Sequence, residues 1–212
     1  MYFDSSNITK IINNCNKQII EDELKKLVSF SNNNHNSEIW FSFAGHGITQ
    51  YNSNENDKQS ELLVPEDYRI SGFISDCWIF SEFISKLHSS SKVFLLIDCC
   101  HSGTICNLPY SKINRNSCME WVDNFNSDLA KQINLANIIK ISGCKDNQTS
   151  ADAYINQKFQ GAMSSTFKNC ISNENDFSKT LDILNTNISK KYTQQPIIST
   201  TNKDIVKWVL YN

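Results

Sequence analysis

Three features that would direct this chain toward particular partners are missing from its sequence. No charge of one sign dominates, because 20 Lys and Arg stand against 22 Asp and Glu, for a net charge of −2. Proteins that bind nucleic acid or anionic membranes usually carry a basic face, so we expect neither partner. No apolar run is long enough to span a bilayer, and residues 1–7 lack the apolar core of a secretory signal.

What remains is the composition of an ordinary soluble globular protein, with 40% hydrophobic and 20% charged residues. A length of 212 residues suits one domain with a real core, and no internal repeat is seen, so we expect a single domain over residues 1–212. The eight cysteines are irregularly spaced and two of them, Cys99 and Cys100, are adjacent, which disfavours disulfides. Without an export signal, we expect reduced thiols in the cytoplasm.

The hydrophobic pattern predicts an α/β fold. Helical spacing of apolar residues over 8–28 predicts one amphipathic helix, or two with a break near Glu21 and Asp22. Strands alternating with helices are typical of a mostly parallel sheet. Three short runs rich in β-branched and aromatic residues are expected to be buried strands, over residues 39–43, 93–97 and 137–141.

The segments between and after these strands are assigned from capping and turn residues. A helix is expected to begin at Ser75 or Asp76, either of which can cap it. Residues 48–72 are expected to form an irregular loop, and 111–132 an exposed polar segment. Later helices are expected near 161–171 and 177–192, and late strands over 196–199 and 205–210.

Reactive residues flanked by glycine follow the first two predicted strands. His46 lies between Gly45 and Gly47, and Cys100 follows the second strand shortly before Gly103. Because ligands bind at the carboxyl ends of parallel strands, we expect His46 and Cys100 to lie close together. A cysteine attacks a carbonyl as the thiolate, and a nearby imidazole promotes that form. The pair therefore predicts nucleophilic catalysis, with amides near Gly47 and Cys100 facing the developing oxyanion.

Other interpretations of these residues stay open at this point. A lone histidine or cysteine at a strand end is usually structural, and only the pairing of two such ends favours catalysis. Cys15 and Cys170 lie on apolar helix faces, where buried hydrophobic cysteines are more common than reactive ones. A zinc site is a further alternative, although its four candidate ligands lack paired Cys-x-x-Cys spacing; they are Cys99, Cys100, His101 and Cys106.

Longer motifs run in a fixed order along the chain. They are FSFAGHG over 41–47, LVPEDY over 63–68, IDCCHSGT over 97–104 and ISGCKDNQTSAD over 141–152. With these motifs the chain resembles the metacaspase branch of the caspase-like cysteine peptidases, over most of residues 39–200. His46 lies 54 positions before Cys100 (100 − 46), near the spacing of about 50 noted for caspases.

This resemblance implies a three-layer α/β/α caspase-like fold and a cysteine endopeptidase that cleaves peptides or proteins after Arg or Lys. It implies that Cys100, rather than Cys99, is the nucleophile and that His46 is the base. Asp98 falls in the pocket that holds the basic side chain. The complete set of expected substrate-binding positions is Asp98, Ala44 and Gly47.

The chain also departs from the family pattern. The strand, helix and second strand that open the family domain have no counterpart, so we expect an N-terminally truncated fold. Residues 39–43 would then form an open sheet edge, which predicts self-association or a partner chain. Ala44 replaces a serine of the substrate pocket. The family's acidic calcium positions keep one carboxylate, Asp76, so no metal or other cofactor is expected; the other three positions are Ser60, Cys77 and Asn107.

Two functions are consistent with these observations. The first is a cytoplasmic cysteine endopeptidase, favoured by the intact pair of His46 and Cys100. The alternative is a truncated, inactive caspase-like module that binds or regulates a partner, favoured by the missing opening strands.

Overall fold

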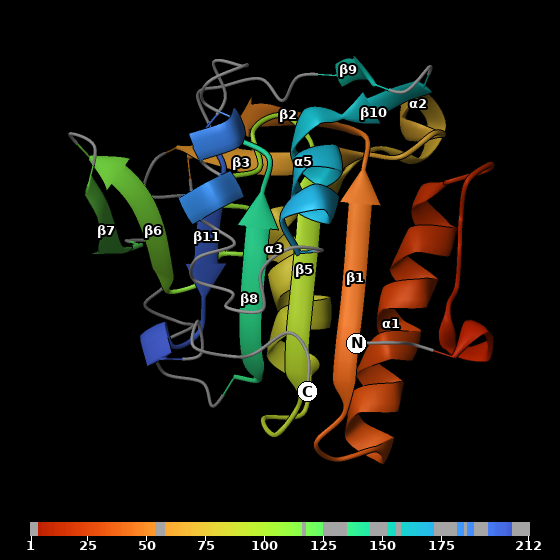
Figure 1. The fold of residues 1–212 in the computed structure, drawn as a ribbon. Coiled ribbons are helices and arrows are strands. Elements are labelled where there is room, and N and C mark those ends of the chain that lie inside the picture. Colours follow the sequence, from red (N-terminus) through yellow and green to blue (C-terminus); the bar gives the residue numbers. More distant parts are fainter. Residues whose placement is uncertain are drawn as a thin grey trace.

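The structure is a computed structural model that describes residues 4–53, 58–115, 118–124, 135–144, 152–155, 158–171, 182–184, 186–188 and 195–204. A central sheet of six strands, in the order β1-β5-β8-β11-β6-β7, lies between helices on its two faces (Figure 1). This arrangement confirms the predicted three-layer α/β/α architecture. The strands are β1 (Glu38–Ala44), β5 (Lys92–Asp98), β8 (Asn137–Ser142), β11 (Ile197–Thr200), β6 (Tyr110–Arg115) and β7 (Cys118–Asp123).

The three strands predicted from their apolar runs form the parallel half of this sheet. β1 pairs with β5 and β5 with β8, so Phe43, Ile97 and Ser142 lie side by side near the carboxyl ends. Every residue of β5 after Lys92 is buried, as expected for a strand covered on both faces. β11 runs antiparallel to both β8 and β6, and β7 runs antiparallel to β6.

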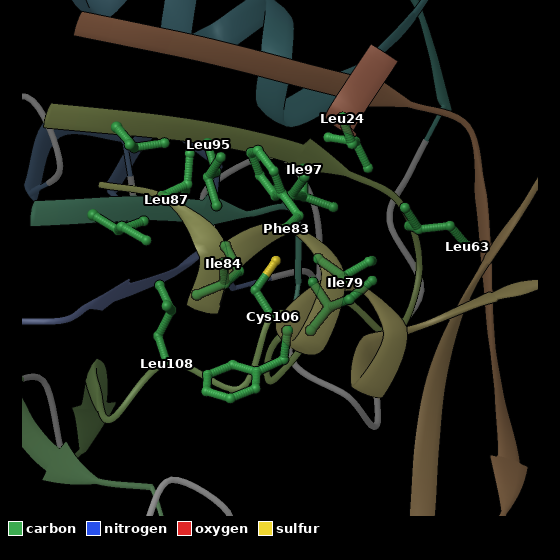
Figure 2. Packing of buried hydrophobic residues seen from close by; sticks show 14 of the residues in the cluster. Leu24, Leu63, Ile79, Phe83, Ile84, Leu87, Leu95, Ile97, Cys106 and Leu108 are labelled. Carbon is green, nitrogen blue, oxygen red and sulfur yellow. The ribbon is translucent and has the colours of Figure 1, made fainter. Parts of the chain in front are cut away.

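Two hydrophobic cores fill the space between the sheet and its helices. On one face, Leu95 of β5 packs with Phe83 of the helical segment that precedes the strand (Figure 2). On the other face, the ring centroid of Phe94 lies 4.0 Å from that of Trp40 and 5.6 Å from that of Phe167. Phe167 belongs to α5 (Ala162–Ile171), so α5 and the earlier helical segment hold the sheet between them.

The helix expected to begin near Ser75 is confirmed. Ser75 Oγ accepts a hydrogen bond from the Trp78 amide at 3.2 Å and so satisfies one of the unpaired donors of the first turn. Three consecutive helical pieces follow without a break. They are α3 (Asp76–Trp78), η2 (Ile79–Phe83) and η3 (Ile84–Lys86).

The first long helix, α1 (Lys17–Asn33), begins later than the apolar pattern predicts. After a short 3-10 turn, η1 (Ser5–Asn7), the chain stays irregular until Asn14, which has a left-handed φ of 57°. Asn16 is extended directly before the helix. Asparagine favours turns over helix because its side chain competes for backbone hydrogen bonds, so the expected helix over 8–16 is wrong. Of the two alternatives for this segment, one continuous helix is confirmed over the rest of the pattern, because Glu21 and Asp22 both lie inside α1.

The loop expected over residues 48–72 is wrong, because most of that segment is regular. β2 (His46–Tyr51) and β3 (Gln59–Val64) form an antiparallel pair, extended by β4 (Ile74–Ser75). A single helical turn, α2 (Tyr68–Ser71), lies between β3 and β4. The three strands lie beyond the carboxyl ends of β1, β5 and β8, toward which those arrows point in Figure 1. Backbone pairing stabilises the sheet although the segment is rich in polar residues.

Of the predictions for the later part of the chain, one is wrong in part and two are confirmed. The expected exposed segment over 111–132 is wrong in its first part, because β6 and β7 belong to the central sheet and Ser111 is buried. α5 and β11 confirm the helix and strand expected near 161–171 and 196–199. A hairpin of β9 (Asp152–Ile155) and β10 (Lys158–Gly161) was not expected.

Two expected elements fall largely on residues outside the described part. Of the helix expected over 177–192, residues 182–184 and 186–188 are helical. The strand expected over 205–210 lies outside the described residues. Within the described residues, no helix combines the length and the apolar character needed to cross a bilayer.

Candidate active site

The carboxyl ends of β1 and β5 bring the two predicted catalytic residues to adjoining positions. Ala44 and Asp98 form the last registered pair of these strands, and the Gly45 amide donates to the Asp98 carbonyl at 3.2 Å. His46 and Cys100 each follow two positions after that registered pair. The strand ends therefore bring His46 and Cys100 to the same edge of the sheet, as the sequence predicted.

Gly47 packs closely against the turn that follows β5. A Cβ at this position would lie 2.2 Å from the Cys100 carbonyl oxygen and 2.9 Å from Cys99 Sγ. Only a glycine lets two backbones approach so closely. Gly47 is buried, whereas His46, the residue before it, is exposed. The histidine therefore lies at the surface, next to this backbone contact.

A tight turn after β5 presents Cys100. His101 adopts a left-handed φ of 52°, a conformation that non-glycine residues rarely take. Ser102 Oγ donates to the Cys99 carbonyl at 2.8 Å and so stabilises the turn. Cys100 itself is half-buried, so its thiol group lies at the surface of the turn rather than in the core.

The two adjacent cysteines stand in different environments. Cys99 is 1% exposed, and burial, assisted by the nearby Cys144 and Asp98, raises the pKa of its thiol far above the ordinary value. The Cys144 thiol donates to the Cys99 carbonyl at 3.5 Å. A buried thiol that stays protonated is a poor nucleophile at neutral pH. The environment therefore favours Cys100 over Cys99.

Asp98, the predicted substrate-binding carboxylate, makes a structural contact with α5. Its side chain is 4% exposed, and Oδ2 accepts a hydrogen bond from the Ser164 amide at 2.8 Å. Ser164 lies in the first turn of α5, where a carboxylate is stabilised by the helix dipole. Ala44 is the registered partner of Asp98, so both Cβ atoms point to the same face of the sheet. The contact with Ser164 was not foreseen, because it joins residues 66 apart in the sequence.

The inferred calcium positions form a hydrogen-bonded group in place of a shell of carboxylates. Asp76 is 1% exposed; its Oδ1 accepts from the Cys77 amide at 2.8 Å and its Oδ2 from Asn107 Nδ2 at 3.2 Å. Ser60 Oγ accepts from Asn52 Nδ2 at 2.8 Å. Calcium binds six to eight oxygen ligands and favours carboxylates, so these four positions do not fit that ion.

The described cysteines near the site do not form a zinc site either. Among the described residues, no group of three or more His, Cys, Asp or Glu side chains could hold a metal ion. Cys106, one of the four candidate ligands, lies in the core, and burial raises the pKa of its thiol to about 11. The seven cysteines whose side chains are described are all free thiols.

Lys140 is the residue of this region that sequence analysis missed. It lies in the middle of β8, is fully buried, and donates from Nζ to carbonyl oxygens of the loop that follows Cys100. A signal was available, because a single charge interrupts the apolar run of residues 138–141. Charged side chains are almost never fully buried without partners.

Comparison with known proteins identifies the family of an α/β chain that carries a cysteine and a histidine at adjoining strand ends. A sequence profile described as "Metacaspase, peptidase C14 domain" matches residues 2–109, just over half of the chain. Metacaspase-1 of Kluyveromyces lactis is 28% identical, over 79% of this chain and 49% of that protein. Metacaspase-1 of Arabidopsis thaliana is 37% identical, over 60% of this chain and 36% of that protein.

The fold has a solved counterpart as well. A crystal structure of a protein from Geobacter sulfurreducens superimposes with a TM-score of 0.63 at 19% identity, covering 93% of this chain and 79% of that one. The chain belongs to the metacaspase family, a family of cysteine peptidases with a caspase-like α/β fold. It spans about half the length, or less, of these curated relatives.

Proposed function

We propose that this chain is a cysteine endopeptidase in which Cys100 is the nucleophile and His46 is the general base. The observation that carries the proposal is the packing of Gly47 against the Cys100 carbonyl. A Cβ at position 47 would lie only 2.2 Å from that carbonyl oxygen. That contact fixes His46 relative to Cys100, and such a pair must be close in space rather than in sequence. Family membership supports the same chemistry.

The reaction that follows from these roles is acyl transfer. His46 accepts the proton of the Cys100 thiol, and the thiolate attacks the carbonyl carbon of the scissile peptide bond. The amides of Gly47 and Cys100 face the oxyanion that forms. When the tetrahedral adduct collapses, the C–N bond breaks and the imidazolium returns its proton to the leaving amine. Water then hydrolyses the thioester, which releases the acid and restores the thiol.

Asp98 supports a preference for Arg or Lys before the scissile bond. A carboxylate pairs strongly with a guanidinium or ammonium group in a partly dry cleft. Here one oxygen of Asp98 already accepts from the Ser164 amide, and Ala44 offers no hydroxyl beside it. With fewer acceptors in the pocket, we propose a preference for basic residues that is weaker than a complete pocket would give.

This specificity is tested with short fluorogenic peptides that differ only in the residue before the scissile bond. We expect Arg and Lys to exceed Leu in kcat/KM, and Asp98→Asn to remove most of the difference. The variant Ala44→Ser restores a hydroxyl and should increase discrimination about tenfold, since a hydrogen bond to a charged group is worth about 1.5–3 kcal/mol. Cys100→Ala is the blank. A preference for Asp at this position would contradict the role given to Asp98, and no turnover by folded protein would favour the inactive binding module.

Calcium is expected to have little effect on this chain. Asp76 supplies one carboxylate, and Asn107 donates a hydrogen bond to it at 3.2 Å. We expect less than a twofold change in activity between added calcium and chelator, and no binding detectable by calorimetry. The double variant Cys77→Glu, Asn107→Asp restores two carboxylates and is expected to gain binding. Micromolar calcium affinity in the unchanged protein would contradict this prediction.

We propose a cytoplasmic location, which reduced thiols support. Disulfides are rare in the cytoplasm, and the seven cysteines with described side chains are free.

We also propose that the edge of β1 associates with a second copy of this chain. Within the described residues, β1 pairs only with β5, and it carries no charge after Glu38. Apolar edges without charged residues pair readily with other strands. Light scattering is expected to show association that increases with concentration, and Ser42→Lys, in the exposed part of β1, should reduce it. Ser29→Lys on α1 is the matched control, and a monomer at every concentration would overturn the proposal.

A further inference from the structure

Lys140 is a fully buried cation whose described partners include the loop that carries the nucleophile. Its side chain has no exposed surface, and Nζ donates to the carbonyl of Ser102 at 3.2 Å and of Gly103 at 2.9 Å. The carbonyl of Ile105 accepts a third hydrogen bond from the same ammonium group. The lysine lies 35 to 38 positions from these residues in sequence, so β8 reaches across to the turn after β5.

This loop is held in a conformation that its residues do not favour. His101, Cys106 and Asn107 have φ values of 52°, 78° and 48°, although none of them is glycine. Left-handed residues of this kind persist only where the surrounding structure determines the backbone. Lys140 is suited to this task, because an ammonium group can donate three hydrogen bonds at once.

A methionine of similar length would fill the same space without the desolvation that a buried charge requires. Burying an ammonium group is unfavourable unless its hydrogen bonds are made. Filling the core therefore does not account for a lysine at this position. The three carbonyl groups that accept hydrogen bonds from Nζ do account for it, and the first of them belongs to Ser102, two residues after Cys100.

We propose that Lys140 is a positioning residue for Cys100. By fixing the backbone from Ser102 to Ile105, the ammonium group holds Cys100 against Gly47 and beside His46. The inference rests on the proposed function, because it assumes that Cys100 reacts as a thiolate.

The test is the pH profile of cysteine alkylation, which needs no peptidase activity. Iodoacetamide labelling is followed at each cysteine by mass spectrometry, in the unchanged chain and in Lys140→Met. We expect labelling of Cys100 at pH 7 to become about tenfold slower in Lys140→Met, because a thiol that is no longer held beside the imidazole is less readily converted to the reactive thiolate. The exposed Cys77 should label equally in both proteins.

The pattern over all cysteines separates positioning from general loss of structure. If Lys140→Met merely loosened the core, labelling of buried Cys99 and Cys144 would rise; under the proposal only Cys100 changes. Lys112→Met is the matched control, because Lys112 of β6 is also a strand lysine but pairs with Asp182, at 3.7 Å, and not with the loop after Cys100. It is expected to leave every profile unchanged.

Each further outcome decides one of the two proposals. If Cys100 of the unchanged chain labels like Cys77, the proposed function fails. If Cys100 is activated in the unchanged chain and equally so in folded Lys140→Met, the positioning role fails. Should Lys140→Met not fold, Lys140→Gln is measured in its place, because its shorter side chain has only two N–H donors for the three carbonyl partners of Lys140. An unchanged Cys100 profile in that variant would overturn the inference.

Discussion

Cys100→Ala is expected to abolish peptide hydrolysis, whereas Cys99→Ala should retain most of it. Removal of a catalytic nucleophile leaves only catalysis from binding and oxyanion stabilisation, a loss on the order of 10⁴-fold or more in kcat. Cys99 is different because it is 1% exposed and burial raises the pKa of its thiol. Its replacement removes one buried sulfur atom and is expected to lower stability slightly.

The measurement is the kcat of each variant on a peptide with Arg before the scissile bond, with unfolding followed by circular dichroism. Cys99→Ala is the matched control, because it changes the adjacent cysteine and leaves the strand end intact. His46→Ala is expected to lose activity to the same extent as Cys100→Ala, and the double variant should lose no more, since the two residues act as a unit. Activity that survives in Cys100→Ala would show that another residue is the nucleophile.

Gly47→Ala is expected to reduce both activity and stability. The added methyl group would lie 2.2 Å from the Cys100 carbonyl oxygen, which belongs to backbone and cannot rotate away. The two strand ends must separate to accommodate it, at a cost of about 1–3 kcal/mol or more in the free energy of unfolding. Separation also moves His46 away from Cys100, and a shift of about 1 Å can reduce a catalytic rate about 100-fold.

Gly72→Ala provides the comparison for this variant. Gly72 has a positive φ of 75°, but an added Cβ there meets no atom within 4 Å. Its replacement is expected to lower stability by about 1 kcal/mol through backbone strain and to leave kcat/KM unchanged. Thermal unfolding and kcat/KM are measured for both variants. If Gly47→Ala behaved like Gly72→Ala, the close packing at the strand ends would have no part in catalysis.

The parallel half of the sheet and the approach of its strand ends were predictable because they depend on local signals. Runs such as residues 93–97 are apolar at every position, a pattern that suits a strand covered on both faces. Once the strands are parallel, residues that follow them lie at one edge of the sheet, which is the basis for predicting that His46 and Cys100 act together. The sharp turn at Cys100 follows from the same placement.

The antiparallel strands were missed because their stability comes from distant partners. β6 contains Ser111, whose hydroxyl lies 2.9 Å from that of Ser199 inside the protein, so a polar residue occupies a buried position. β2 and β3 likewise contain many polar residues and depend on pairing with each other. Hydrophobic periodicity cannot reveal a buried serine whose hydroxyl is hydrogen-bonded to the hydroxyl of another serine.

The site residues that sequence reasoning missed have the same origin. Lys140 and Ser164 contact the segment around Cys100 from 35 or more positions away in the sequence: Lys140 donates to the Ile105 carbonyl, and the Ser164 amide donates to Asp98. A lone charge in an apolar strand marks Lys140 as unusual, but only the fold identifies its partners. For Ser164 the contact uses a backbone amide, which any residue would supply at that position.

The strand order has a consequence for how the protein is synthesised. The β6–β7 hairpin leaves the ribosome well before β11, yet β11 is the strand that joins it to β8. Until residues 197–200 arrive, β8 is a second exposed edge and the hairpin has no place in the sheet. Contacts between residues as far apart as Ser111 and Ser199, 88 positions, form slowly because a long loop must close first. A nascent chain therefore stays open and prone to aggregation until residues 197–200 have been made, and a chain terminated before β11 cannot complete this sheet.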